Sequence, residues 1–193
     1  MKKNFFVLGV FCLSLFAACD SDRRTAQGDG YQDTTATGTD TRAGMLEDDT
    51  REFMTDAASG GMMEVELGRI VQQKATNQDV KDFAAMMVKD HSAANERLMA
   101  LAQSKNIQLP QQMKEDHQEE VNRFRDMKAG QDFDKEYVKL MVEDHEEDIK
   151  EFEEAQEDVQ DAEIRQWVDN TLQSLRQHKQ RIDQIKEAMD KRS

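Results

Sequence analysis

Apolar residues recur at intervals of three and four from about Glu47 to the end of the chain, and very little interrupts them. Pro110 is the only proline among the 193 residues, and only two glycines, Gly68 and Gly130, follow Met63. Spacings of three and four bring apolar side chains onto one face of an α-helix. A β-sandwich, a barrel or a Rossmann-type fold needs more turn-forming residues than this chain offers. The sequence therefore predicts an all-α domain.

The helical pattern divides into five amphipathic segments. Four are long, at about residues 48–76, 78–105, 133–156 and 161–189, and one is short, at about 111–128. The links within the first and the second pair of long segments are so short that each pair is expected to form an antiparallel hairpin. We therefore expect a ferritin-like up-down four-helix bundle of two helical hairpins plus one short connecting helix, over residues 48–190.

Two adjacent glycines, Gly60 and Gly61, fall inside the first long segment. Each costs a helix about 1 kcal/mol relative to alanine. They indicate either a kink or a place where another helix approaches closely.

The first 47 residues differ in composition from the rest. A basic start, Met1-Lys2-Lys3, precedes an uncharged run at 5–18 that is too short for a comfortable membrane span. Small residues then lead to Cys19, which resembles a bacterial lipoprotein signal, where the cysteine is lipidated and becomes the mature N-terminus. The alternative is an ordinary cleaved signal peptide with a chance cysteine. We expect a signal peptide over 1–18, a lipidated Cys19, and a disordered tether over 19–47.

The charge balance excludes several classes of protein. Lys and Arg number 26 against 40 Asp and Glu, a net charge of −14, whereas nucleic-acid binding needs a basic face. Both cysteines, Cys12 and Cys19, lie at the N-terminus, so no thiol nucleophile or cysteine-based zinc site is available to the helical segments. No nucleophile–base motif, glycine-rich phosphate loop or HExxH motif is present either. These observations favour a binding module over an enzyme.

Each long segment carries one strongly polar residue on its apolar face. These residues are Glu64, His91, His145 and His178. Burying an unpaired carboxylate costs several kcal/mol, so Glu64 needs a partner. A rise of about 1.5 Å per residue, counted from the hairpin turns, puts Glu64 and His91 in one layer to within about 3 Å. The same count offsets His178 from His145 by about 6 Å, so we expect His178 to lie one turn away from the other three.

Two interpretations of these four residues remain open. In the first they form a metal site, because histidine and carboxylate ligands suit Zn, Cu, Fe or Ni, and facing helices of a bundle are where such sites form. Asp90 and Asp144, next to two of the histidines, would then orient imidazoles on adjacent helices. In the second they form a buried hydrogen-bonded layer that fixes helix register. The Glu-x-x-His pairs of di-iron bundles are absent, which argues against a ferritin-type oxidase.

Methionine is abundant near the histidines. Met87 and Met141 lie one turn before His91 and His145. Thioether and imidazole together would suit Cu(I), but methionines at helical spacing more often fill irregular core space. We interpret the methionines as core residues, and His117 on the short segment as structural.

One pattern occurs twice in the chain. Residues 83–91 and 137–145 share the pattern aromatic-x3-Met-Val-x-Asp-His, at an offset of 54. The two hairpins therefore look like related halves, as is common in ferritin-like bundles.

A family resemblance rests on four short motifs. They are Glu64-Val-Glu66-Leu67-Gly68, Met87-Val-Lys-Asp90-His91 with Asn95 and Leu98, Phe133-Asp134-x-x-Tyr137 with Met141 and His145, and a late His178. In this order and spacing they resemble the ferritin-like bacterial family called domain of unknown function 4142, over about residues 47–190. The chain departs from the family at 171–175, where Leu-Pro is usual. The resemblance implies a ferritin-like fold and an exported or lipid-anchored protein, and it implies no reaction.

Together these observations favour an envelope-anchored helical-bundle lipoprotein, on the outer membrane or the periplasmic face. We expect a binding or stress-related module that contacts the membrane through its lipid. In the more specific form of this hypothesis, the module binds Zn, Cu or Fe, and the ligands are Glu64, His91, His145 and His178. One alternative is a metal-dependent redox enzyme, which needs an open coordination position beside a cavity. The other is a structural protein whose acidic face meets a basic protein partner.

Overall fold

The computed structural model describes the backbone of residues 37–192 and the side chains of residues 48–192. Within this range the chain forms five helices and no strand, so the predicted all-α bundle is confirmed. The helices are α1 (Thr37–Lys74), α2 (Gln78–Ser104), α3 (Glu115–Asp126), α4 (Gln131–Asp158) and α5 (Ala162–Asp190). None of the described helices is both long enough and apolar enough to span a bilayer.

The first helix is longer than its apolar pattern predicts. α1 begins at Thr37 instead of about Asp48, so it includes residues 37–47, whose composition predicts part of a disordered tether. Threonine, glycine and aspartate are weak helix formers. Extending a formed helix is much easier than nucleating one, however, because each added residue gains a hydrogen bond. The predicted signal peptide, Cys19 and the remainder of the tether lie outside the described residues.

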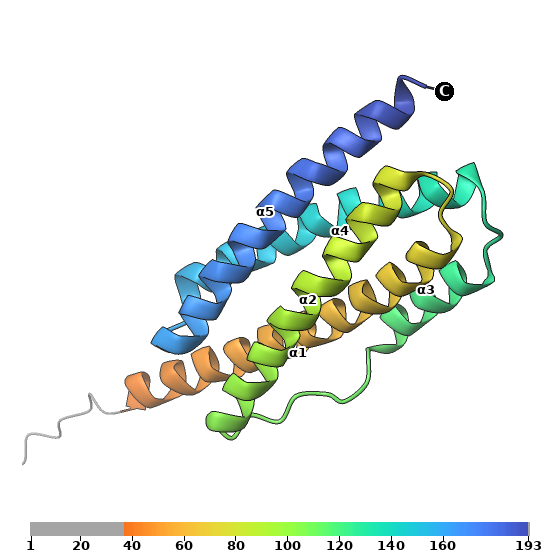
Figure 1. Cartoon of the computed structure of the whole chain (residues 1–193). Helices are drawn as coiled ribbons and strands as arrows, with labels where there is room; N and C mark the ends of the chain where they lie inside the picture. Colours follow the sequence, from red (N-terminus) through yellow and green to blue (C-terminus); the bar gives the residue numbers. More distant parts are fainter. Residues whose placement is uncertain (1–36, 193) are drawn as a thin grey trace, which may run out of the picture. The chain divides into compact units, whose positions relative to one another are not determined.

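The four long helices form a bundle in which each packs against two others. α1 packs on α2, α2 on α5, α5 on α4 and α4 on α1, so α1 is diagonal to α5, and α2 is diagonal to α4. Figure 1 shows that α2 and α4 run in the same direction. The long connection from the end of α2 to the start of α4, which includes α3, returns along the length of the bundle. One long crossover of this kind characterises ferritin-like bundles.

Side-chain carboxylates and amides fix the two hairpin turns. Asn77 caps α2 by accepting from the Asp79 backbone N–H at 2.9 Å. In the turn between α4 and α5, Asp161 accepts from the backbone N–H of Glu163 at 2.9 Å and of Ile164 at 3.1 Å. Such caps satisfy the free N–H groups of a first turn.

The turn between α1 and α2 is also held by a buried carboxylate from another helix. Asp134 of α4 accepts from the Thr76 backbone N–H at 3.0 Å, from the Thr76 hydroxyl at 2.6 Å and from the Asn77 backbone N–H at 2.8 Å. The residue is only 1% exposed. Asp134 therefore ties the first hairpin to the second.

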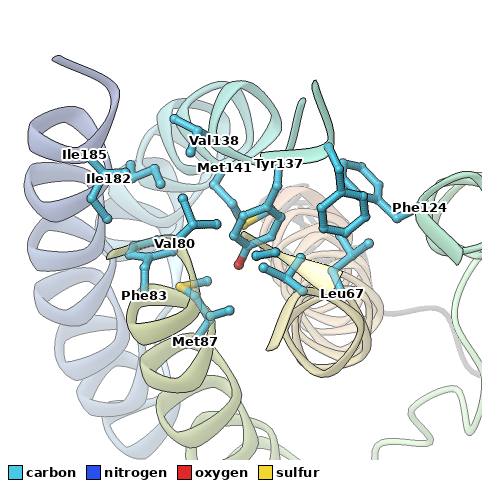
Figure 2. Packing of buried hydrophobic residues seen from close by; sticks show 14 of the residues in the cluster. Leu67, Val80, Phe83, Met87, Phe124, Tyr137, Val138, Met141, Ile182 and Ile185 are labelled. Carbon is cyan, nitrogen blue, oxygen red and sulfur yellow. The ribbon is translucent and has the colours of Figure 1, made fainter. Parts of the chain in front are cut away.

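The apolar core divides into two clusters. One lies towards the turn between α1 and α2 and includes Leu67, Phe83, Met87, Tyr137 and Met141 (Figure 2). The other lies towards the turn between α4 and α5 and is built around Met54, Leu98, Phe152, Trp167 and Leu175. Met87 and Met141 are fully buried among apolar side chains, which agrees with their interpretation as core residues.

α1 and α2 approach each other closely at two glycines. A Cβ added to Gly61 would lie 2.3 Å from the Asn95 side chain, and one added to Gly68 would lie 2.7 Å from Val88 and 2.9 Å from the Ala84 carbonyl oxygen. α1 continues without interruption through this region. Of the two interpretations of the glycine pair, the close helix approach is therefore the one that Gly61 meets, and Gly68 adds a second such point.

Candidate metal centre

The four polar residues of the apolar faces meet between the two core clusters. Glu64 of α1, His91 of α2, His145 of α4 and His178 of α5 are all buried, with His145 0% exposed and Glu64 2% exposed. Each comes from a different helix of the bundle, and the three imidazole rings lie within 5.2 to 5.9 Å of one another, centroid to centroid. The helical periodicity therefore selected side chains that come together in space.

The expected axial offset of His178 is wrong. The Nδ1 atom of His178 lies 3.3 Å from the Nε2 atom of His91, so the two residues share one layer. The estimate assumed that α4 and α5 start level with each other at their turn. The His145 and His178 rings lie 5.5 Å apart, centroid to centroid, so counting residues from a level turn does not give the position of His178 along the bundle.

The close approach of α1 and α2 positions Glu64 against His91. Glu64 lies three residues after Gly61 and four before Gly68, so all three share one face of α1. The Oε2 atom of Glu64 is 2.5 Å from the Nδ1 atom of His91. Side chains at the two glycines would hold the helices apart and would lengthen this contact.

Four groups form a continuous chain of close polar contacts through the bundle. Beyond the contact between Glu64 and His91, the Nε2 atom of His91 faces Nδ1 of His178 at 3.3 Å. The Nε2 atom of His178 in turn lies 3.1 Å from the Oδ2 atom of Asp90. The chain thus runs from a carboxyl on α1 to a carboxylate on α2 by way of two imidazoles.

Burial decides the charge of these groups. It lowers the pKa of His91 and of His178 to about 4, and it lowers the pKa of His145 well below its usual range. It raises the pKa of Glu64 to about 8. Near pH 7 both partners of the Glu64–His91 contact are therefore uncharged, and the contact is not an ion pair.

The proton positions follow from the chain itself. Asp90 accepts from Nε2 of His178, so Nδ1 of neutral His178 is an acceptor and Nε2 of His91 must donate to it. The Nδ1 atom of His91 then carries no proton, and it faces the Glu64 carboxyl, which is hydrogen-bonded to Asp144. A protonated Glu64 beside this nitrogen agrees with the raised pKa of Glu64. Both imidazoles donate towards Asp90.

His145 stands outside this chain. Neither of its ring nitrogens makes a hydrogen bond of strict geometry among the described residues, although the side chain is fully buried; the backbone carbonyl of Met141, one turn earlier on α4, is an acceptor beside the ring. Its Nε2 atom is 3.8 Å from Oε1 of Glu64, whose carboxyl is hydrogen-bonded to that of Asp144. Buried polar atoms are nearly always paired, so Nε2 of His145 indicates a partner that the chain itself does not supply.

Two sets of residues bring potential ligand atoms within 4.8 Å of one another. One set is His91, His145 and His178, and the other is Glu64, Asp144 and His145. Burial and the neighbouring Glu64 raise the pKa of Asp144 well above its usual range. Of the two aspartates expected to orient imidazoles on adjacent helices, Asp90 contacts His178 of α5, whereas Asp144 lies beside Glu64 of α1 instead.

The repeated sequence pattern corresponds to a pseudo-twofold arrangement in space. The diagonal, parallel helices α2 and α4 each contribute an Asp-His pair, Asp90-His91 and Asp144-His145 (Figure 1). The other diagonal pair contributes Glu64 from α1 and His178 from α5, and each of these lies beside one of the two aspartates. The two halves therefore differ at one cluster position, where glutamate replaces histidine.

Two further polar groups lie close to this site, and periodicity alone does not select them. The Tyr137 hydroxyl is buried without a hydrogen-bond partner among the described residues, and its ring packs among the core residues of Figure 2. Burial, with Glu64 and Asp144 nearby, raises its pKa well above the usual range. Asp148, one turn after Asp144, also has a strongly raised pKa because it is buried near other carboxyls. From the sequence alone, Tyr137 is indistinguishable from other core aromatic residues, and Asp148 from the other acids of its helix face.

His117 lies outside the cluster. Its Nδ1 atom is 2.7 Å from the hydroxyl oxygen of Ser59, which also accepts from the Lys114 backbone N–H at 2.8 Å. These contacts join α1 to the start of α3.

The fold and the site define an all-α bundle with a buried His/Glu cluster at its centre. A family model for the domain of unknown function DUF4142 matches residues 35–185, and the chain belongs to this family. No curated protein and no solved structure gives a match to the sequence.

Proposed function

We propose that this bundle binds one transition-metal ion through His91, His145 and His178. The observation that carries the proposal is His145, whose buried Nε2 atom has no hydrogen-bond partner while its ring lies beside two other imidazoles. A layer that only fixed helix register would be expected to pair every polar group. An ion bound between the three rings would supply the partner that His145 lacks.

The contacts of two histidines already resemble those of metal ligands. A ligating imidazole usually donates its second N–H to a carboxylate, which fixes the ring. His178 does so towards Asp90, which leaves its Nδ1 atom for an ion. His91 would bind through Nε2 and donate from Nδ1 to Glu64 once the Glu64 carboxyl has lost its proton.

The spacing of the ring nitrogens fits a small transition-metal ion. Nitrogen ligands at roughly 2.0–2.1 Å from a tetrahedral ion lie about 3.3 Å apart. The two facing nitrogens of His91 and His178 are separated by 3.3 Å. Imidazole ligands suit Zn, Cu or Fe, and three of them leave one position of a tetrahedral ion open.

Metal content tests this proposal. Purified protein is stripped with a chelator, exposed to Zn²⁺, Cu²⁺ or Fe²⁺, freed of excess metal and analysed for bound ions. We expect about one ion per chain, strongly reduced binding in His145→Ala and unchanged binding in the control variant His117→Ala, whose histidine is bonded to Ser59 instead. Wild-type protein without stoichiometric metal, or equal binding by His145→Ala, would contradict the proposal.

We further propose that the bundle is held at the bacterial cell envelope by a lipid on Cys19. The support is the basic start, the short apolar run and the small residues before the cysteine. Wild-type protein should fractionate with membranes, and Cys19→Ser should not. Intact mass of the purified protein should show acyl chains on the N-terminal residue, and an unmodified mass would exclude the anchor.

A metal-dependent redox enzyme is the second candidate, and one observation favours it. A pocket at the surface of the bundle is lined by two of the three proposed ligands, His91 and His178. Repeated reduction and reoxidation of bound Cu or Fe would support this candidate. A bound ion that undergoes neither would leave metal binding as the only function supported.

A further inference from the structure

A pocket lies between α2 and α5 and reaches the polar cluster. Its volume is about 190 Å³, and its lining includes Asp90, His91, Ala94, Arg97, Trp167 and His178. A single water needs only about 10–15 Å³ by a comparable measure. The pocket therefore has room for a molecule of several atoms beside the two imidazoles.

The sequence repeat explains why the pocket lies on this side of the bundle. At the offset of 54 residues, Ala93, Ala94 and Arg97 on α2 correspond to Glu147, Asp148 and Glu151 on α4. Small side chains leave space beside His91, whereas the other half has the larger, half-buried side chain of Asp148 in the place of Ala94. The half with the pocket therefore has the cationic Arg97 at the position where the other half has the acidic Glu151.

The polar groups at the mouth of the pocket suit an anion. Arg97 is exposed, and within the described part of the chain its guanidinium has no ion-pair or hydrogen-bond partner. Asp90 is the one acidic residue of the lining, and its carboxylate already contacts His178 and Lys89. The positive charge of Arg97 is therefore available to a ligand.

One wall of the pocket is rigid. The indole N–H of Trp167 donates to the backbone carbonyl of Ala94 at 3.0 Å, which joins α5 to α2. The other side of the indole packs against Phe53 and Phe152. Trp167 is the only tryptophan of the chain and is 5% exposed, so protein fluorescence reports on its surroundings: this pocket and a neighbouring one, which Ala94 does not line.

We propose that the pocket between α2 and α5 binds a small anion, held by Arg97, that completes the coordination of the metal ion. The second part of this proposal rests on the proposed metal site, whereas anion binding by the pocket does not. His91 and His178 lie both on the pocket wall and in the set of three facing imidazoles, so an anion in the pocket is adjacent to the ion. The chemical class is a monovalent anion of a few atoms.

The first experiment uses the metal-free protein. Iodide, a small anionic quencher, and acrylamide, a neutral one, are titrated against Trp167 fluorescence. Iodide should quench wild type, and Ala94→Leu, which fills the pocket, should abolish this quenching. Ala85→Leu, at an exposed alanine of the same helix, is the matched control and should quench normally.

Arg97→Gln supplies a second variant in the same assay. Loss of one nearby charge in a solvated pocket should weaken iodide quenching by about threefold to fivefold and leave acrylamide quenching unchanged. Equal iodide quenching in wild type, Ala94→Leu and Arg97→Gln would overturn the anion pocket, whatever metal the protein binds.

The second experiment uses protein loaded with Cu²⁺, its metal content confirmed by analysis, and follows azide by absorption and electron paramagnetic resonance. Wild type and Ala85→Leu should show azide-dependent changes at the copper, and Ala94→Leu should keep its copper and lose them. A loaded protein that is insensitive to azide would overturn the coordination step and leave the metal site intact. Iodide quenching without any metal loading would overturn the metal site and the coordination step together, and would leave the anion pocket.

Discussion

Three glycines of α1 provide a graded test of how closely α1 and α2 approach. A Cβ added to Gly60 has only the His117 ring as a neighbour, at 3.9 Å, which is ordinary contact. One added to Gly61 meets the end of the Asn95 side chain at 2.3 Å, which must move. One added to Gly68 meets Val88 at 2.7 Å and the backbone oxygen of Ala84 at 2.9 Å, and a backbone atom cannot move aside on its own.

The expected free energies follow from two opposing contributions. Alanine in place of helical glycine gains about 1 kcal/mol, and overpacking a close contact costs about 1–3 kcal/mol. Gly60→Ala should therefore stabilise the fold by about 1 kcal/mol, or about 3 °C in Tm for a domain of this size. Gly68→Ala should destabilise it by about 1 kcal/mol net, and Gly61→Ala should fall between the two.

Urea denaturation of the metal-free protein, followed by circular dichroism, measures all three variants. Gly68→Ala should also weaken metal binding, because wider separation of α1 and α2 moves Glu64 away from His91. Equal stabilisation by Gly60→Ala and Gly68→Ala would refute the close approach, and with it the reason given for the short contact between Glu64 and His91.

Three other perturbations are expected to have defined outcomes. Asp134→Ala leaves the turn between α1 and α2 without its acceptor and should lower the free energy of unfolding in urea by about 3 kcal/mol, whereas Asp132→Ala, at an exposed position, should have little effect. In the metal-free protein, Glu64 has a pKa of about 8 when folded against 4.5 ordinarily. The folded state then holds the extra proton, so Tm should fall as pH rises between these values, and less steeply in Glu64→Gln. His178, with its pKa lowered from 6.5 to about 4, acts oppositely: stability should fall as pH drops through this interval, and His178→Phe should reduce that loss, measured by the same thermal scans.

The sequence predicts which side of a helix a residue lies on better than it predicts the position of that residue along the bundle axis. Periodicity of three and four identifies Glu64, His91, His145 and His178 because the rotation of a residue around a helix depends only on its position in the chain. The level of His178 depends on the stagger between α4 and α5, which is set by packing along the whole hairpin. The same limit applies to the start of α1, because residues 37–47 carry composition typical of a tether but continue a helix that is stabilised further along.

The pocket and the proton positions require contacts that no linear pattern contains. In the sequence, Ala94 is one more small residue on the apolar face of α2 and Arg97 an ordinary surface residue; their role requires Trp167 and His178 to be placed opposite them. Likewise, only the pairing of His178 with Asp90 fixes which nitrogen of each imidazole carries the proton. The repeat at an offset of 54 does contain a usable signal, because it aligns Ala94 with Asp148 and so marks where the halves differ.

The pseudo-twofold arrangement also makes the donor groups around the proposed metal site adjustable by single substitutions. Glu64 and His178 are equivalent positions of the two halves, so Glu64→His would give four imidazoles and His178→Glu would give two imidazoles and two carboxylates. The first set suits softer ions such as copper, and the second suits harder ones such as iron or manganese. One scaffold thus offers three related donor sets, and comparing their metal preferences would separate the effect of ligand chemistry from that of the surrounding fold.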